Sequence, residues 1–230
     1  MKRIFGLAAA VALVIGVIQA QGQSVIFTFG DSTSDGWVAG GFSSSPALPL
    51  VNIGGQNYIS APLSGSYQVA NVNSGTVSGG PAVSFNAAFL AALENPAGYA
   101  LTYNYYIDTS TFTTPGTYLQ MGSFINTGSG YYQQGAGTPS AYEPQFDGTQ
   151  VASGSVFSGS VTVPFSGYGA ADASAPTETY FRLGIILNGD GTGVTVDYTR
   201  VSIVPIPEPG SLALIGMGMA SLIMIRRRKS

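Results

Sequence analysis

Apolar and polar residues alternate with a period of two over several segments of this 230-residue chain. The clearest segment follows Tyr99, where four apolar positions share one face: Leu101, Tyr103, Tyr105 and Ile107. Residues 118–125 and 155–165 show similar alternation between Gly, Pro or Ser residues. This pattern is typical of strands with one buried face, so it predicts a β-rich domain.

A further pair of strands is predicted towards the C-terminal end of the body. Apolar residues alternate from Phe181 to Leu187, and Asn-Gly-Asp-Gly at 188–191 then predicts a hairpin into a strand over 194–204. The apolar residues Val194 and Val196 occupy even-numbered positions of that strand, whereas Val201 and Ile203 occupy odd-numbered positions. This shift predicts a β-bulge near Asp197–Thr199.

One helix is predicted, over Asn86–Glu94, with Asn86 as its cap and alanines that favour helix. Alternation is weak from residue 40 to 84, and the sequence leaves open whether that stretch is ordered. Recurrent strands separated by turn residues predict an all-β fold, an antiparallel, jelly-roll-like β-sandwich with one short helix.

Both chain ends differ from this body. Lys2 and Arg3 precede an apolar stretch over 4–18, and small residues follow at Ala20 and Gly22. This order predicts a secretory signal peptide over residues 1–22, cleaved after Ala20 or after Gly22. The alternative is a segment that stays uncleaved as an anchor.

The C-terminal end begins with a proline-rich segment over 205–209, which contains Pro207, Glu208 and Pro209. Proline fixes φ and lacks an N–H group, so this segment is expected to be extended and open to a binding cleft. An apolar run over 210–225 predicts a short transmembrane helix. The basic residues of 226–230, which include Arg226, Arg227 and Arg228, should stay on the cytoplasmic side. Residues 23–204 form the predicted domain.

In this order and at this end, the motif, the span and the arginines resemble the PEP-CTERM proteins of Gram-negative bacteria. The resemblance implies an exosortase as partner, with processing at or near Pro-Glu-Pro, and passage through the export machinery and the inner membrane. It also implies a place in the envelope or outside the cell, beside exopolysaccharide and biofilm. A simple anchor that is never processed is the alternative.

Composition limits the chemistry of the body. The body contains ten carboxylates but only two basic residues, Arg182 and Arg200. Its net charge is therefore near −8, although the net charge of the whole chain is −3. A surface so poor in cations does not suit nucleic acid. The chain has no His and no Cys, and its lysines lie in the terminal segments. The usual general base, thiol nucleophile and zinc ligands are thus missing, which argues against an enzyme.

The edges of the body resemble the jelly-roll sandwiches of carbohydrate-binding modules. The first strand at 25–29 with Asp-Gly-Trp at 35–37, and the last strand at 194–201, carry this resemblance. Tyr198 stands where Asn or Asp is commoner in those modules. Aromatic platforms for sugars would then be Trp37, Tyr131 and Tyr132, whereas core packing or ordinary exposure is the alternative for each ring.

Two motifs near the first strand carry further hypotheses. Gly30, Asp31 and Ser32 resemble the first block of GDSL-type serine hydrolases, but such a serine needs a base that this histidine-free chain lacks. If the first and last strands are neighbours, Asp31 and Asp197 can approach each other and hold a structural calcium, as in many jelly rolls. Solvated turn carboxylates are the alternative, and no other cofactor is expected.

The sequence therefore favours an exported, exosortase-processed protein that serves as a structural or adhesive component of the envelope or extracellular matrix. The alternative is a carbohydrate-binding module for exopolysaccharide. A hydrolase acting on polysaccharides or esters is a third hypothesis.

Overall fold

A computed structural model describes residues 22–30, 33–40, 46–62, 67–74, 76, 80–110, 118–134, 145–147, 156–169, 180–189 and 194–207 of the chain. Residues 1–21 of the predicted signal peptide and the predicted C-terminal span lie outside these ranges, as do Asp31, Ser32, Glu208, Pro209 and the terminal arginines. Among the described residues, no helix is both long enough and apolar enough to cross a membrane.

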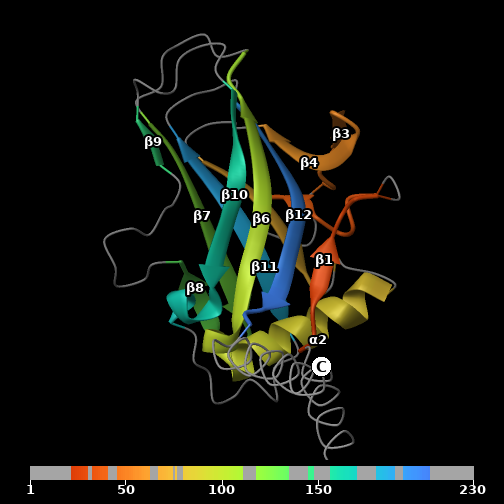
Figure 1. The fold of residues 1–230 in the computed structure, drawn as a ribbon, viewed down its shortest axis with the longest axis vertical. Helices are drawn as coiled ribbons and strands as arrows, with labels where there is room; N and C mark the ends of the chain where they lie inside the picture. The colour runs from red at the N-terminus through yellow and green to blue at the C-terminus, as the bar shows by residue number, and fades with distance from the viewer. Residues whose placement is uncertain are drawn as a thin grey trace, which may run out of the picture.

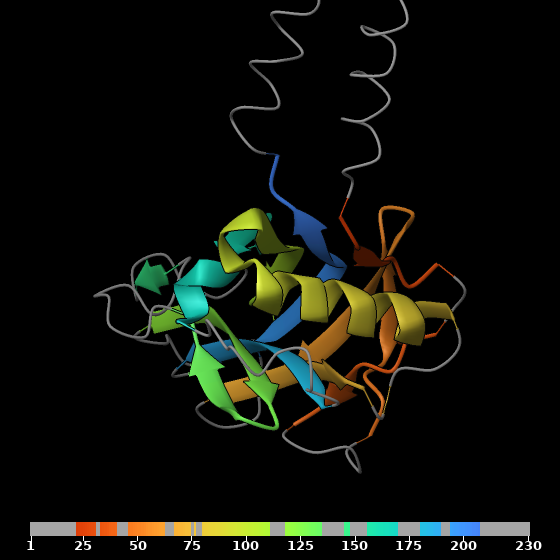
Figure 2. The same cartoon turned by 90° about the horizontal axis from the view of Figure 1, so that it is seen from below.

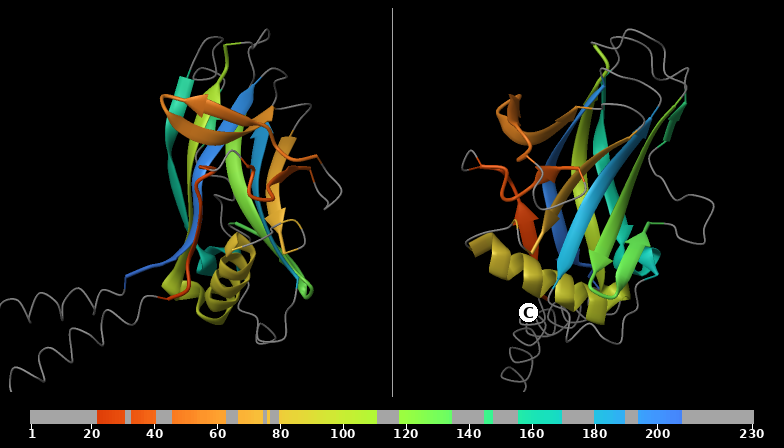
Figure 3. Two further views of the ribbon diagram at one scale, coloured as in Figure 1. Left: turned by 90° about the vertical axis from the view of Figure 1, so that its right-hand side faces the viewer. Right: turned by 180° about the vertical axis from the view of Figure 1, so that it is seen from behind.

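Two six-stranded antiparallel sheets face each other (Figures 1 and 3). Sheet A has the order β10-β6-β12-β4-β3, with β1 also paired to β12. Its strands are β1 (Val25–Phe27), β3 (Leu50–Ile53), β4 (Gln56–Pro62), β6 (Tyr99–Asp108), β10 (Val156–Pro164) and β12 (Thr195–Pro205). The predicted fold class, an antiparallel β-sandwich, is confirmed.

Sheet B has the order β2-β5-β11-β7-β8, with β9 paired to β7. Its strands are β2 (Val38–Ala39), β5 (Tyr67–Asn73), β7 (Tyr118–Thr127), β8 (Gly130–Gln133), β9 (Gln145–Asp147) and β11 (Phe181–Gly189). Two short 3₁₀ helices, η1 (Pro96–Gly98) and η2 (Phe165–Tyr168), precede and follow strands of sheet A.

The predicted hairpin over 188–191 is wrong. β11 pairs with β5 and β7 in sheet B, whereas β12 pairs with β6, β4 and β1 in sheet A. The connection therefore crosses from one sheet to the other. Leu187 on β11 and Val196 on β12 are both fully buried, so the apolar faces of the two strands belong to opposite layers of one core.

The predicted bulge is confirmed, slightly later in the chain than expected. The register of β12 against β6 shifts between Thr199 and Ser202, and Arg200 adopts a φ of 50°. Tyr198 is buried before the shift and Val201 after it, so the extra residue keeps both parts of the strand facing the core.

The single long helix, α2 (Gly80–Glu94), begins six residues earlier than predicted. Pro81 lies in its first turn, where a missing N–H costs no hydrogen bond. Asn86 is therefore not a cap: it lies inside the helix, and its side-chain oxygen is buried without a hydrogen-bond partner in the structure. The helix crosses the lower end of the sandwich (Figure 2), where Phe85 meets Phe27 of sheet A and Phe89 meets Phe181 of sheet B.

Three strands, β3, β4 and β5, lie in the stretch where alternation is weak. In β5, Ala70 and Val72 are buried towards the core, but Asn71 between them is also buried, on the outer face. Both faces of such a strand are covered, so a contrast between apolar and polar positions is not expected.

Candidate functional site

The outer face of sheet A is built around a buried carboxylate. Asp197 lies on β12 between Ser60 of β4 and Tyr106 of β6. Its side chain is 5% exposed and is hydrogen-bonded to Ser60, but its Oδ1 atom is buried and makes no hydrogen bond to any described residue. Burial raises the pKa of Asp197, and the nearby carboxylate of Asp108 raises it further.

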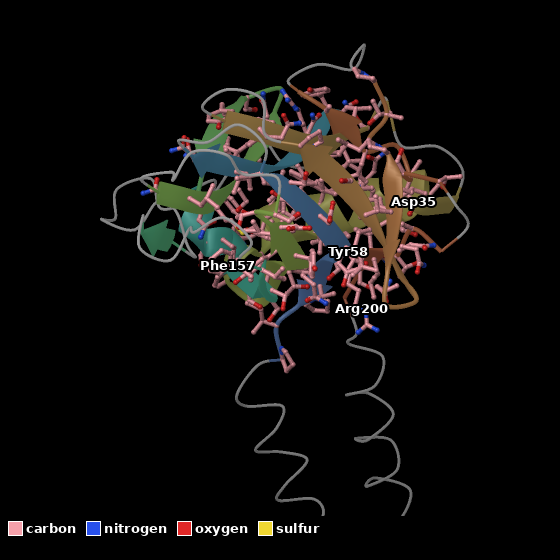
Figure 4. The ribbon with its side chains drawn as sticks, turned by 90° about the horizontal axis from the view of Figure 1, so that it is seen from above. Asp35, Tyr58, Phe157 and Arg200 are labelled. Carbon is pink, nitrogen blue, oxygen red and sulfur yellow. The ribbon has the colours of Figure 1, made fainter. Side chains whose placement is uncertain are left out.

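Two tyrosines lie beside this carboxylate on the same face. The ring centroids of Tyr58, on β4, and Tyr106, on β6, are 6.5 Å apart with an interplanar angle of 61°. Both side chains are half-buried. We call Asp197, Ser60, Tyr58 and Tyr106 the carboxylate patch. Arg200, further along β12, is exposed and projects away from the sandwich (Figure 4).

The outer face of sheet B carries a buried cation instead. Arg182 on β11 is only 9% exposed, and its Nε atom donates a hydrogen bond to Oδ1 of Asn71 at 3.1 Å. One Nη atom donates to the carbonyl oxygen of Gly40 at 3.5 Å. The Asn71 amide in turn donates to the carbonyl oxygens of Val38 and Gly40. The Asn71 side chain and the Gly40 backbone therefore both fix the position of the guanidinium.

Aromatic rings continue this arrangement across the sheet. The guanidinium carbon of Arg182 lies 5.1 Å from the ring centroid of Phe124, on β7. Phe124 stacks on Tyr131 of β8 with centroids 5.1 Å apart and planes inclined by 30°. The four side chains of Asn71, Arg182, Phe124 and Tyr131 come from four adjacent strands, and we call them the arginine row.

A glycine makes room for this row. Gly184 is the cross-strand partner of Phe124, and a Cβ atom at Gly184 would overlap the Phe124 ring. The ring therefore lies directly on the β11 backbone, close to Arg182. Phe124 itself is buried, whereas Tyr131 at the end of the row is 53% exposed.

The predicted aromatic platforms fall in different places. Trp37 is fully buried, and its ring meets Phe27 edge-on at 5.6 Å, so it belongs to the core and not to either outer face. Tyr132 is half-buried and packs against the core from β8. Tyr131, on the opposite side of the same strand, is the exposed ring. Tyr198 is also buried in the core.

The first and last strands are neighbours, as the calcium hypothesis assumed, because β1 pairs with β12. Asp31 lies outside the described residues, so its distance from Asp197 stays open. Within the described ranges, no group of three or more acidic side chains is placed to hold a metal ion. The serine of the hydrolase-like motif, Ser32, is likewise outside them.

The described ends of the chain contact two adjacent residues, Gly98 and Tyr99. A Cβ atom at Gly22 would overlap the hydroxyl group of Tyr99, and the same hydroxyl group is hydrogen-bonded to the backbone of Gln23. At the other end, β12 stops at Pro205, and the Ile206 amide donates to the carbonyl oxygen of Gly98 at 2.8 Å. Pro207 is exposed. The last backbone hydrogen bond of the described residues is therefore that of Ile206, directly before Pro-Glu-Pro.

Residues 205–229, which begin at the last residue of β12, match the PEP-CTERM protein-sorting motif. The chain carries an exosortase sorting signal. A PEP-CTERM signal marks an exported precursor that passes through a membrane and is processed by an exosortase. No curated protein matches the chain in sequence.

Solved structures with a similar chain path include carbohydrate-binding modules. A cellulose-specific module of family 28 is 15% identical, with 78% of this chain and 91% of that chain covered and a TM-score of 0.48. A family 22 module from Clostridium thermocellum is 11% identical, with 82% and 98% covered and a TM-score of 0.42. The family 11 module of that organism, in complex with a mixed-linked tetrasaccharide, is 8% identical, with 82% and 99% covered and a TM-score of 0.40. At these identities the similarity concerns the fold alone.

Sequence patterns missed most of both outer faces. Tyr58 and Asn71 lie in the stretch without alternation, and Tyr106 and Phe124 resemble other strand aromatics. One signal was present: Arg182 is one of two basic residues in an acidic body and occupies an outward position between buried Phe181 and Leu183. A lone cation at such a position points to a site with a specific partner.

Proposed function

We propose that this protein is delivered by the exosortase route and serves, after processing, as a structural or adhesive component of the cell envelope or extracellular matrix. The observation that carries the proposal is the position of the sorting motif. It starts where β12 ends, and the last described backbone hydrogen bond of the chain is that of Ile206. Cleavage at Pro-Glu-Pro would leave every described strand of the sandwich in the mature protein.

Composition supports a non-catalytic role for this body. The chain has neither His nor Cys, and its carboxylates are not accompanied by lysines in the body. General acid–base or nucleophilic chemistry would have to rely on carboxylates and hydroxyl groups alone.

Cell fractionation tests the delivery step. In wild-type cells we expect the protein in the outer envelope or the medium, and in an exosortase-deficient strain we expect it in the inner membrane. Glu208→Ala should reproduce the deficient strain, whereas Glu94→Ala, an exposed glutamate at the end of α2, should not. The same distribution in both strains would contradict the proposal.

A second candidate function, binding of exopolysaccharide, is favoured by the arginine row. Its exposed Tyr131 ring is held flat against Phe124, and a fixed aromatic surface beside polar groups is suited to stacking against a sugar ring. Affinity electrophoresis in gels that contain soluble polysaccharide measures this binding. Tyr131→Ala should abolish retardation, whereas Tyr58→Ala on the opposite sheet should leave it unchanged. Absence of retardation in every polysaccharide would exclude this function.

A further inference from the structure

Arg182 is a buried cation, and it has no carboxylate partner within the described ranges of the chain. No ion pair of Arg182 is formed with any residue of the described part of the chain, and its hydrogen bonds go to two neutral oxygen atoms. Buried charges in proteins are normally paired with an opposite charge, because removing an ion from water is costly.

The guanidinium is held in place on one side only. Its Nε atom and one Nη atom are directed towards β5 and β2, through Asn71 and Gly40. The hydrogen bonds of the described residues leave the other Nη atom unused. Since the bonds of Asn71 to the backbone fix the position of the group, little side-chain entropy remains to be lost when an anion binds.

The aromatic part of the row lies on the other side of the cation. Tyr131 and Arg182 are both cross-strand partners of Asn126 on β7, so they stand two strand spacings apart, about 10 Å. Phe124 bridges this distance by contacting both side chains. The face thus offers a flat exposed ring, a half-buried amide at Asn126 and a fixed cation within one short span.

We propose that the arginine row binds an anionic polysaccharide, with one sugar ring stacked on Tyr131 and the carboxylate of a neighbouring sugar residue paired with the guanidinium of Arg182. This inference rests on the polysaccharide-binding function proposed above and adds the charge of the ligand. Guanidinium and carboxylate groups match in geometry and form strong, charge-assisted hydrogen bonds. A body near −8 disfavours polyanions over most of its surface, so any preference of sheet B for a charged ligand has to come from Arg182.

Polygalacturonate and its fully methyl-esterified form make a matched pair of probes, because they differ in charge and share the sugar ring. With the full-length chain in detergent, we expect binding of polygalacturonate to be roughly 10-fold or more tighter than binding of the ester. Arg182→Gln keeps a donor near Asn71 and removes the charge, so it should abolish that difference. Arg200→Gln makes the same change of charge on the exposed bulge of sheet A and should have no effect.

The outcomes separate the inference from the function on which it rests. If polygalacturonate and its ester bind equally, and if Tyr131→Ala abolishes both, the proposal of an anionic ligand is wrong. The proposed binding of polysaccharide would still be supported. Binding of neither polymer or of any other polysaccharide would overturn both. Dextran sulfate distinguishes the source of the charge: preference for it over polygalacturonate, with the same dependence on Arg182, would assign a sulfated sugar within the anionic class.

A folding defect in the glutamine variant is controlled by a second substitution. Arg182→Lys keeps the charge but loses the planar donor pair, so we expect weaker but still charge-dependent binding of polygalacturonate. Thermal unfolding of each variant shows whether the fold is intact. Unchanged discrimination in a folded Arg182→Lys and a folded Arg182→Gln would overturn the inference.

Discussion

The two outer faces of the sandwich carry opposite charges in similar positions. On sheet A the buried group is the carboxylate of Asp197, at the centre of the sheet and beside two tyrosines. On sheet B it is the guanidinium of Arg182, also on a central strand and beside Phe124. The inner faces of the two sheets, in contrast, are alike and apolar.

The difference lies in how each charge is supported. Arg182 is fixed by Asn71 and by the Phe124 ring. In contrast, one oxygen of Asp197 has no hydrogen-bond partner in the described part of the chain, and the carboxylate of Asp108 lies nearby. The buried charge of sheet B is thus better supported by hydrogen bonds than that of sheet A, although neither has an opposite charge beside it among the described residues. Substitutions on the two faces should therefore have effects of opposite sign on stability.

The largest effect is expected at Asn71. Asn71→Ala removes the acceptor of the Arg182 Nε and the donor to two backbone carbonyls, so buried groups lose their partners. We expect a loss of about 2–3 kcal/mol in the free energy of unfolding, measured by urea denaturation. Asn104→Ala, at a half-buried outward position of sheet A, is the matched control and should cost far less. Equal losses would show that Asn71 does not support the cation.

Gly184 should tolerate substitution poorly for a steric reason. Gly184→Ala places a methyl group where the Phe124 ring lies, so the ring must move away from Arg182. We expect a cost of about 1–3 kcal/mol, seen as a lower melting temperature. Gly167→Ala, whose new methyl group would lie 3.9 Å from Val163, is the control. A neutral Gly184→Ala would contradict the packing of the arginine row.

On sheet A the sign reverses. Asp197→Asn keeps an acceptor for Ser60 and removes a charge that burial and Asp108 disfavour. At pH 7 and without calcium we expect the melting temperature to rise by about 2–4 °C. Because the pKa of Asp197 is higher in the folded state than in the unfolded state, the penalty is fully present above the folded pKa. It disappears as the pH falls towards the unfolded pKa, so the two proteins should converge at acidic pH.

Calcium sharpens the same comparison. If Asp197 holds a structural calcium, as the sequence suggested, added calcium should raise the melting temperature of the wild-type protein and leave Asp197→Asn unchanged. A flat response of the wild-type protein to millimolar calcium would end that hypothesis. The higher melting temperature of Asp197→Asn without calcium would then be explained by the loss of the buried charge alone.

The smallest effect on stability is expected at Tyr131. Its ring is more than half exposed, and its contact with Phe124 is a single stacking pair. Tyr131→Ala should therefore cost about 0.5–1 kcal/mol, by thermal unfolding. A large loss of stability would identify Tyr131 as a structural residue and weaken its role as a sugar platform.

Sequence patterns predicted the layers of this fold better than its connections. Alternation in β6 and β10 reflects one buried face and one more open face, and it appears in the sequence for that reason. In β11 and β12 the outward positions are mostly polar or glycine, although several of them, such as Arg182 and Asp197, are buried. The path from β11 to β12 does not follow from alternation, because a strand with one apolar face fits either sheet. The Asn-Gly-Asp-Gly turn therefore predicted a hairpin where the chain changes sheets.

The candidate sites were harder to predict, because they depend on registers between distant strands. Asn71 and Arg182 are 111 residues apart, and only the pairing of β5 with β11 brings their side chains together. Tyr131 was predicted as a platform from its polar surroundings, but nothing in the sequence separated it from Tyr132. Successive residues of β8 point to opposite faces of the sheet, so Tyr131 is exposed and Tyr132 packs against the core.

The proposed roles of both outer faces require that processing leaves the sandwich intact. The position of cleavage is therefore the most direct test of the proposed function. Intact-mass analysis of the extracellular protein, beside the protein from an exosortase-deficient strain, locates both ends of the mature chain. We predict that the mature protein retains Gly22, where a Cβ atom would overlap the Tyr99 hydroxyl group, and ends after Ile206 and before the apolar run at 210–225. A mature chain that still ends at Ser230 in both strains, or one cut inside β12, would contradict this account.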